Sequence, residues 1–159
     1  MDRIGIFRLA CSIIVCQLAG VAGSIFTVSA IPTWYAALQK PWFTPPGWLF
    51  GPVWLTLYTL MGISLYLVWS KGFKEKKAKI ALGIFAIQLG LNALWSFLFF
   101  GLQSPLLGLA GIIPLWIFIA LSIWAFYRVD KKAAYILIPY IMWVTVATAL
   151  NYYVLILNP

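Results

Sequence analysis

The sequence predicts an all-α membrane protein, a five-transmembrane-helix bundle that forms one domain over residues 1–159. The first observation is composition, since 64% of the 159 residues are hydrophobic and only 9% are charged, which is more apolar surface than a soluble domain of this length can bury. The second is the placement of charge, which leaves long uncharged runs after Arg8, Lys40, Lys79 and Lys132. A spanning helix needs about 20 apolar residues, so the third run holds two helices and each of the others holds one.

The expected helices follow these runs in order. The opening residues, basic and then apolar, also fit a signal peptide, but the apolar run continues to Ile31, which favours a retained span. Pro114 and Pro139 fall inside the fourth and fifth spans, where proline is expected to kink a helix. The spans cover about residues 6–28, 47–69, 80–100, 106–127 and 133–157, with a lid loop at about 30–46.

Basic residues gather on one predicted side of the membrane. Ten of the eleven Lys and Arg lie at the N-terminus or in the segments between spans two and three and between spans four and five, and Lys40 alone lies on the other side. The positive-inside rule then places the N-terminus inside and the C-terminus outside. A multi-pass protein of a bacterial inner membrane is expected. Anionic lipid headgroups, rather than nucleic acid, are the expected contacts of the net charge of +8.

Residues 34–54 form the most unusual stretch of the chain. Tryptophans, among them Trp42 and Trp48, alternate with prolines around a single charge, Lys40. Proline fixes φ and removes a backbone donor, so most of this stretch cannot form a regular helix. Two interpretations stay open: a rigid lid over a cavity, with Lys40 available to meet a ligand carboxylate, or an aromatic belt at the membrane interface.

Aromatic and polar side chains repeat at helical spacing in three of the spans. Carboxamides are costly against lipid, so those in the third span must face the bundle interior, either in interhelical hydrogen bonds or in a cavity. Most members of the set lie in the outer half of the membrane, beneath the lid, which favours a pocket for a flat apolar ligand held by stacking. The set is Trp54 and Tyr58, then Gln88, Asn92, Trp95 and Ser96, then Trp143, Ala147 and Asn151.

Missing residue types limit the chemistry. The chain has no His, and its three acids, Asp2, Glu75 and Asp130, all lie on the predicted inner side. A hydrolase, an ion-coupled pump and a haem-ligating cytochrome are therefore disfavoured, and no metal site or cofactor is expected. Cys11 and Cys16 lack metal-ligand spacing and are interpreted as small core residues.

Four motifs together resemble the tryptophan-rich sensory protein/translocator protein family, which includes the peripheral-type benzodiazepine receptor. They are W-x-x-x-L-x-K-P-x-x-x-P-P (34–46), W-x-x-L-Y-x-x-M-G (54–62), Q-L-x-L-N-x-x-W-S (88–96) and P-Y-x-x-W-x-x-x-A-x-x-L-N-Y (139–152). The resemblance covers nearly the whole chain. It implies a homodimeric five-helix bundle that binds porphyrins such as protoporphyrin IX and hydrophobic drug-like ligands of the isoquinoline carboxamide or benzodiazepine type.

The resemblance also implies roles for particular residues. Trp54 and Trp143 match the tryptophan pair implicated in light-dependent porphyrin breakdown, and no other catalytic residue is expected. The sterol motif of the family is incomplete, because no Lys or Arg follows Tyr152. With the lid and helix positions above, the expected ligand-binding set is Tyr35, Trp42, Trp48, Trp54, Tyr58, Asn92, Trp95, Trp143, Ala147 and Asn151.

A receptor or scavenger of tetrapyrroles is the leading functional hypothesis. One alternative is a transporter that moves porphyrins or other amphipathic molecules, sterols included, across the membrane. Another is a structural or regulatory membrane protein whose tryptophans serve only packing and the interfacial belt. The outer-half position of the polar residues, and the lack of an intramembrane carboxylate for coupling, favour binding over transport.

Overall fold

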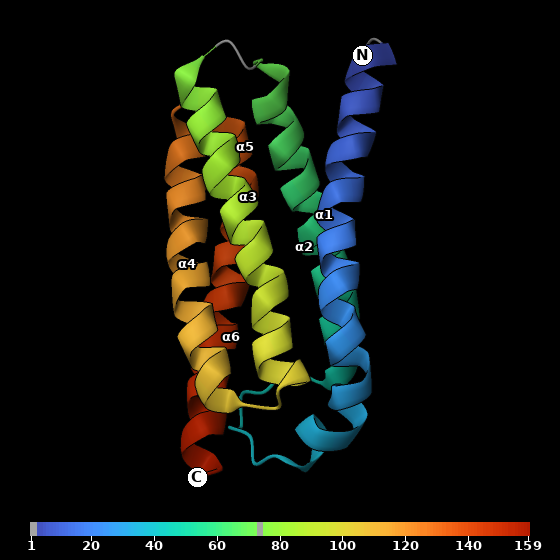
Figure 1. Cartoon of the computed structure of the whole chain (residues 1–159), viewed down its shortest axis with the longest axis vertical. Coiled ribbons are helices and arrows are strands. Elements are labelled where there is room, and N and C mark those ends of the chain that lie inside the picture. Colours follow the sequence, from blue (N-terminus) through green and yellow to red (C-terminus); the bar gives the residue numbers. More distant parts are fainter. Residues whose placement is uncertain (1–2, 73–74) are drawn as a thin grey trace.

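The computed structural model describes residues 3–72 and 75–159. Five helical spans run side by side, with the N-terminus and C-terminus at opposite ends of the bundle (Figure 1). The described residues contain no strand, and the predicted all-α, five-span architecture is confirmed. The elements are α1 (Arg3–Ala30), η1 (Ile31–Tyr35), α2 (Gly47–Ser70), α3 (Lys76–Ser96), η2 (Phe97–Gly101), α4 (Pro105–Tyr127), α5 (Lys131–Ile136) and α6 (Ile138–Leu157).

The first span is longer than predicted, and the loop after it is shorter. α1 continues directly into η1, a π-helical segment, and helical turns last to Ala37. Pro32 lies at the start of η1 and has no N–H to donate to a carbonyl in the last turn of α1. The expected lid loop of residues 30–46 is therefore corrected to a non-helical connector of residues 38–46. Prolines exclude helix there, and α2 begins directly after Pro46, as predicted.

Pro139 interrupts the last span. α5 ends at Ile136 and α6 begins at Ile138, with Pro139 in its first turn. Proline has no N–H to offer the carbonyl of Tyr135, so the helix restarts instead of continuing. The expected bend thus takes the form of a break. Pro114, in contrast, lies within α4, which is a single helix over its whole length.

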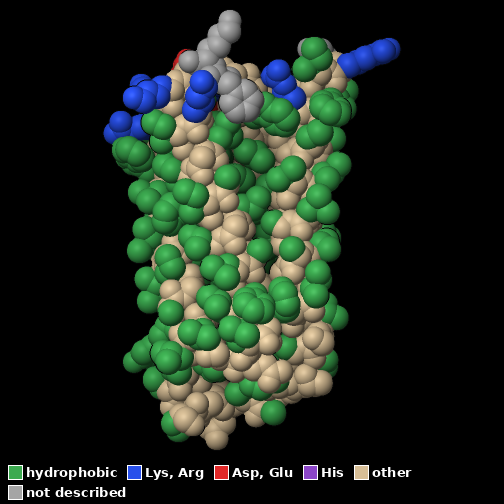
Figure 2. Space-filling model, viewed as in Figure 1, with side chains coloured by type: hydrophobic (Ala, Val, Ile, Leu, Met, Phe, Trp, Pro, Cys, Tyr) green, Lys and Arg blue, Asp and Glu red, His purple; other side chains and the backbone are tan. Residues whose placement is uncertain are grey.

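Lys and Arg side chains gather at the end of the bundle that carries the N-terminus (Figure 2). We call this the basic end, and the opposite end, which carries residues 38–46, the connector end. Asp2 and Lys74, two of the charges predicted on the inner side, lie outside the described residues. The gathering of Lys and Arg at one end of the bundle agrees with the charge pattern of the sequence.

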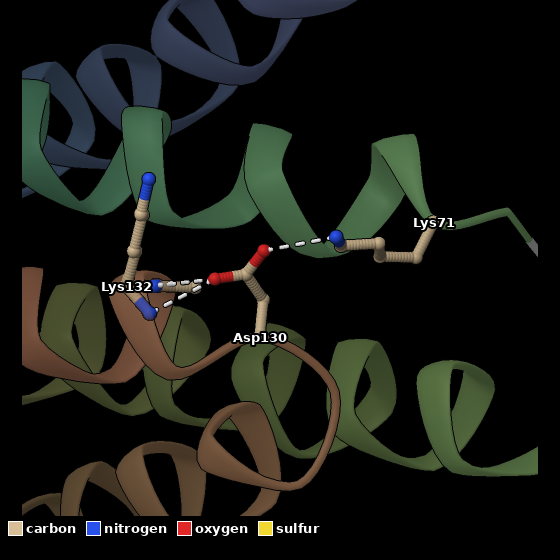
Figure 3. A network of polar contacts seen from close by, with 4 residues as sticks. Lys71, Asp130 and Lys132 are labelled. Atoms are coloured by element: carbon tan, nitrogen blue, oxygen red, sulfur yellow. Dashed lines mark hydrogen bonds and ion pairs between the residues drawn. The ribbon is translucent and has the colours of Figure 1, made fainter.

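Asp130 ties the helices together at the basic end (Figure 3). Its Oδ2 lies 3.2 Å from Lys71 Nζ at the end of α2, and its Oδ1 accepts from the backbone N–H of Lys132 at 2.9 Å, which caps α5. Burial raises the pKa of Asp130, but the hydrogen bonds and the charge of Lys71 outweigh burial, so the pKa lies below its ordinary value.

Glycine lets α1 and α2 approach closely. A Cβ added at Gly62 would lie 2.5 Å from the Cα of Ile13, and one added at Gly20 would lie 2.5 Å from Cε2 of Tyr58. Only a residue without a side chain fits at such contacts. The close approach fixes α1 against α2 and therefore shapes the space that opens between them toward the connector end.

Candidate ligand-binding site

A cavity of about 270 Å³ lies between α1, α2 and the connector end of α3. We call it the lateral cavity. Val21, Val28 and Leu55 line it and are also exposed, so it opens sideways between α1 and α2 on the apolar surface of the bundle. Its remaining lining is Gln17, Gly20, Ser24, Thr27 and Ile31 from α1 and η1, Phe50, Gly51, Trp54 and Tyr58 from α2, and Trp95, Ser96 and Phe100 from α3 and η2.

A buried chain of hydrogen bonds lies on the side of the lateral cavity that faces the basic end. The hydroxyl of Tyr58 donates to Asn92 Oδ1, and Asn92 Nδ2 donates to the hydroxyl of Tyr140 over 2.9 Å. Tyr140 in turn donates to Gln88 Oε1 over 3.0 Å. These groups join α2, α3 and α6. Asn92 and Gln88 thus make interhelical hydrogen bonds, one of the two roles predicted for them.

A second, smaller cavity of about 20 Å³ lies deeper in the bundle, between η1, η2 and α6. We call it the central cavity. Three of its lining residues, Phe50, Trp95 and Phe100, also line the lateral cavity, so their rings form a partition between the two spaces. The other lining residues are Tyr35, Phe99, Ala147, Leu150, Asn151 and Val154.

The structure brings together six of the ten residues expected to bind ligand. Trp54, Tyr58 and Trp95 line the lateral cavity, and Trp95 lines the central cavity as well. The other three, Tyr35, Ala147 and Asn151, line the central cavity.

The remaining four lie elsewhere. Asn92 contacts Tyr58 from the side of the basic end. Trp143 packs edge-on against Phe50 with ring centroids 5.9 Å apart, and its buried Nε1 has no hydrogen-bond partner among the described residues. Trp42 and Trp48 are 96% and 74% exposed and line neither cavity, which fits the aromatic-belt interpretation of these two positions.

The connector, residues 38–46, is nevertheless held in a fixed position over its end of the bundle. Gln39 and Asn158 exchange two hydrogen bonds of 3.0 Å, which tie it to the end of α6. Lys40 donates to the carbonyl of Leu38 at 2.7 Å, and its ammonium lies 5.0 Å from the centre of the Tyr35 ring. Burial lowers the pKa of Lys40. Its charge is thus directed toward the end of the first helix rather than away from the protein.

Sequence reasoning missed Phe50, Phe100 and the α1 wall of the lateral cavity. Phe50 precedes Trp54 by four residues, so helical spacing alone places it on the same face. The α1 wall includes Gly20, Ser24 and Thr27, at i, i+4 and i+7. In a single sequence, such a line of small residues looks the same whether it packs against a helix or borders a cavity.

Comparisons with known proteins match nearly the whole chain to one family. The TspO/MBR family model matches residues 12–157. The chain is 49% identical to "Tryptophan-rich protein TspO" of Archaeoglobus fulgidus, over 96% of this chain and 98% of that protein. It is 47% identical to the protein of the same name from Chlorobaculum tepidum (97% and 98% covered) and 42% identical to the human "Translocator protein" (86% and 81% covered). The chain therefore belongs to the TspO/MBR family.

Proposed function

We propose that this protein is a membrane receptor that takes flat hydrophobic ligands, above all porphyrins such as protoporphyrin IX, from the bilayer into the lateral cavity. The observation that carries the proposal is an aromatic-walled cavity that opens on the apolar flank of the bundle. Trp54, Tyr58 and Trp95 offer ring faces and edges on which a planar molecule can stack. Family membership supports a role as membrane receptor or translocator.

Polar atoms at the edge of the lateral cavity suit a ligand with a polar rim. Gln17 Nε2 donates to Thr59 Oγ1 over 3.0 Å, which holds the amide at the opening between α1 and α2. Ser24 and Thr27 add hydroxyl groups to the same wall. A few polar groups in a mostly apolar pocket orient a ligand without the cost of burying a charge.

Binding is favoured over transport by what lies between the lateral cavity and the basic end. The buried groups of Tyr58, Asn92 and Tyr140 occupy the bundle centre there and hydrogen-bond to one another. A ligand on its way through would have to break these bonds. Transport predicts sustained, gradient-dependent porphyrin flux into sealed vesicles, whereas a receptor gives only stoichiometric uptake.

The cavity volume suggests which ligands bind with least rearrangement. Pockets for drug-sized ligands usually measure about 300–1,000 Å³, so the 270 Å³ of the lateral cavity suits two or three rings, as in an isoquinoline carboxamide or a benzodiazepine.

Light-dependent porphyrin breakdown belongs to the same proposal. Trp54 lines this cavity and can contact a bound porphyrin there, whereas Trp143 lines neither cavity.

The test is a titration of the purified protein in lipid nanodiscs with protoporphyrin IX, followed by porphyrin absorbance. Trp54→Phe is expected to weaken binding by about two- to threefold, because the smaller phenyl ring keeps only part of an aromatic contact worth about 0.5–1.5 kcal/mol. Trp124→Phe is the matched control, since Trp124 is 53% exposed and packs under Arg128 at the basic end. Wild-type affinity in both Trp54→Phe and Trp95→Phe would refute this site.

The orientation and assembly of the protein are part of the proposal. The basic end is assigned to the inside of a bacterial inner membrane because Lys and Arg favour that side (Figure 2). A homodimer is proposed from the resemblance. Gly83 and Gly90 on α3 are candidate contacts, since both are exposed and a Cβ added at either meets nothing within 4 Å.

A further inference from the structure

Only one layer of rings separates the lateral cavity from the central cavity. Phe50, Trp95 and Phe100 border both spaces. A ligand larger than the lateral cavity can therefore gain room by displacing one of these rings. Which ring moves decides where the ligand extends and how large it can be.

Two of the three rings are fixed. Trp95 is 8% exposed, donates its N–H to Asn151 Oδ1, and stacks on Phe99 with ring centroids 5.6 Å apart. Phe100 is 6% exposed and packs edge-on against Tyr35, Trp95 and Phe99. Moving either ring would break several buried contacts at once.

Phe50 is held much less firmly. Its ring is only partly buried, and its ring contacts are edge contacts to Trp143 at 5.9 Å and to Tyr35 at 6.3 Å between centroids. As a phenyl group it makes no hydrogen bond. Beside it, a Cβ added at Gly51 would meet nothing within 4 Å, so there is open space on this side of α2.

The backbone that carries Phe50 is also weakly restrained. Phe50 lies in the first turn of α2, where Pro46 provides no side-chain cap and its carbonyl accepts from the N–H of Leu49 over 3.0 Å. Pro52 then removes the N–H that would bond to the carbonyl of Trp48. The first turn of α2 therefore has fewer hydrogen bonds than the turns that follow it.

We propose that Phe50 is a movable partition that sets the size of ligand this protein accepts. A ligand of two or three rings binds in the lateral cavity with Phe50 in place. A tetrapyrrole displaces the ring and extends into the central cavity, where Tyr35, Ala147 and Asn151 become part of its site. This inference rests on the proposed function and adds to it the residue that discriminates between ligand sizes.

The test compares two ligands and two opposite substitutions. Protoporphyrin IX and an isoquinoline carboxamide are each titrated into wild type, Phe50→Ala and Phe50→Trp in nanodiscs. Phe50→Ala is expected to tighten porphyrin binding by about tenfold, because no ring has to be displaced from its two edge contacts with Trp143 and Tyr35. Phe50→Trp is expected to weaken porphyrin binding by a similar factor. The smaller ligand loses a wall contact when the ring is removed, so Phe50→Ala should weaken its binding rather than tighten it.

Phe43→Ala is the matched control, because Phe43 is also partly buried and packs edge-on against Trp42 and Tyr153 but lines neither cavity. If Phe50→Ala fails to fold, Phe50→Leu replaces it and should shift porphyrin affinity in the same direction by a smaller factor. The partition is refuted if porphyrin affinity is unchanged, or if both ligands shift equally. Failure of the proposed function is distinct, since neither ligand would then bind the wild type.

Discussion

The indole N–H of Trp95 donates to Asn151 Oδ1 over 3.3 Å, and this bond links α3 to α6 beside the central cavity. Asn151 is itself held in place, since its Nδ2 donates to the backbone carbonyl of Pro105 at the start of α4, 2.7 Å away. Asn151 is 1% exposed. One buried amide therefore joins three helices and sets the orientation of the indole ring that faces both cavities.

Asn151→Leu is expected to lower the free energy of unfolding by about 1–3 kcal/mol, because the buried Trp95 N–H loses its acceptor. Porphyrin binding should weaken as well, since the indole is no longer held in one orientation. Thermal unfolding and ligand titration measure the two effects. Thr148→Val on the same helix is the control, because its hydroxyl bonds only to the carbonyl of Val144 within α6. Unchanged stability of Asn151→Leu would contradict this role of the amide.

Asp130 is expected to make the stability of the fold depend on pH in acidic solution. Its pKa in the folded protein is lowered, so its carboxylate stabilises the fold fully above the unfolded-state pKa of about 4. That contribution is lost as the pH falls through the lower pKa of the folded state. Asp130→Asn should flatten the fall in melting temperature below about pH 4. Glu75→Asn is the control, and an identical pH profile for wild type and Asp130→Asn would rule the effect out.

Charge and hydropathy were sufficient to predict the spans, because a bilayer demands long uncharged helices whatever their partners. Helical spacing also placed Trp54, Tyr58 and Trp95 on interior faces. Spacing within one helix carries no information about the helix opposite, so it could not reveal that Asn92 is engaged by Tyr58 and Tyr140.

The proline-rich stretch was the hardest part to interpret. Proline excludes helix from residues 38–46, but it is accepted in a first turn, so helix resumes at Gly47 and places Phe50 on an interior face. The prolines thus marked the connector and the start of α2 correctly, whereas residues 31–37, which were expected in the loop, are helical. Whether Trp42 and Trp48 point inward or outward depends on the path of the connector, which composition does not determine.

The close contact of α1 with α2 is expected to be intolerant of any side chain at Gly62. Gly62→Ala places a methyl group 2.5 Å from the Cα of Ile13, so the helices must separate, at a cost of about 1–3 kcal/mol. Gly51→Ala on the same helix is the control, because the added Cβ meets nothing within 4 Å and alanine favours helix by about 0.5–1 kcal/mol. Thermal unfolding should therefore move in opposite directions for the two variants. A melting temperature that falls equally in both would show that the contact is not restrictive.

The sideways opening of the lateral cavity predicts that ligand enters from the bilayer. Leu55 lines this opening and is 62% exposed, so Leu55→Trp should obstruct it. Leu106 on α4 is also 62% exposed but lines neither cavity, which makes Leu106→Trp a matched control for added surface aromaticity. When porphyrin is mixed with the protein in nanodiscs in a stopped-flow instrument, the association rate should fall several-fold for Leu55→Trp alone. Equal rates in the two variants would instead favour entry past the connector, where Trp42 and Trp48 lie.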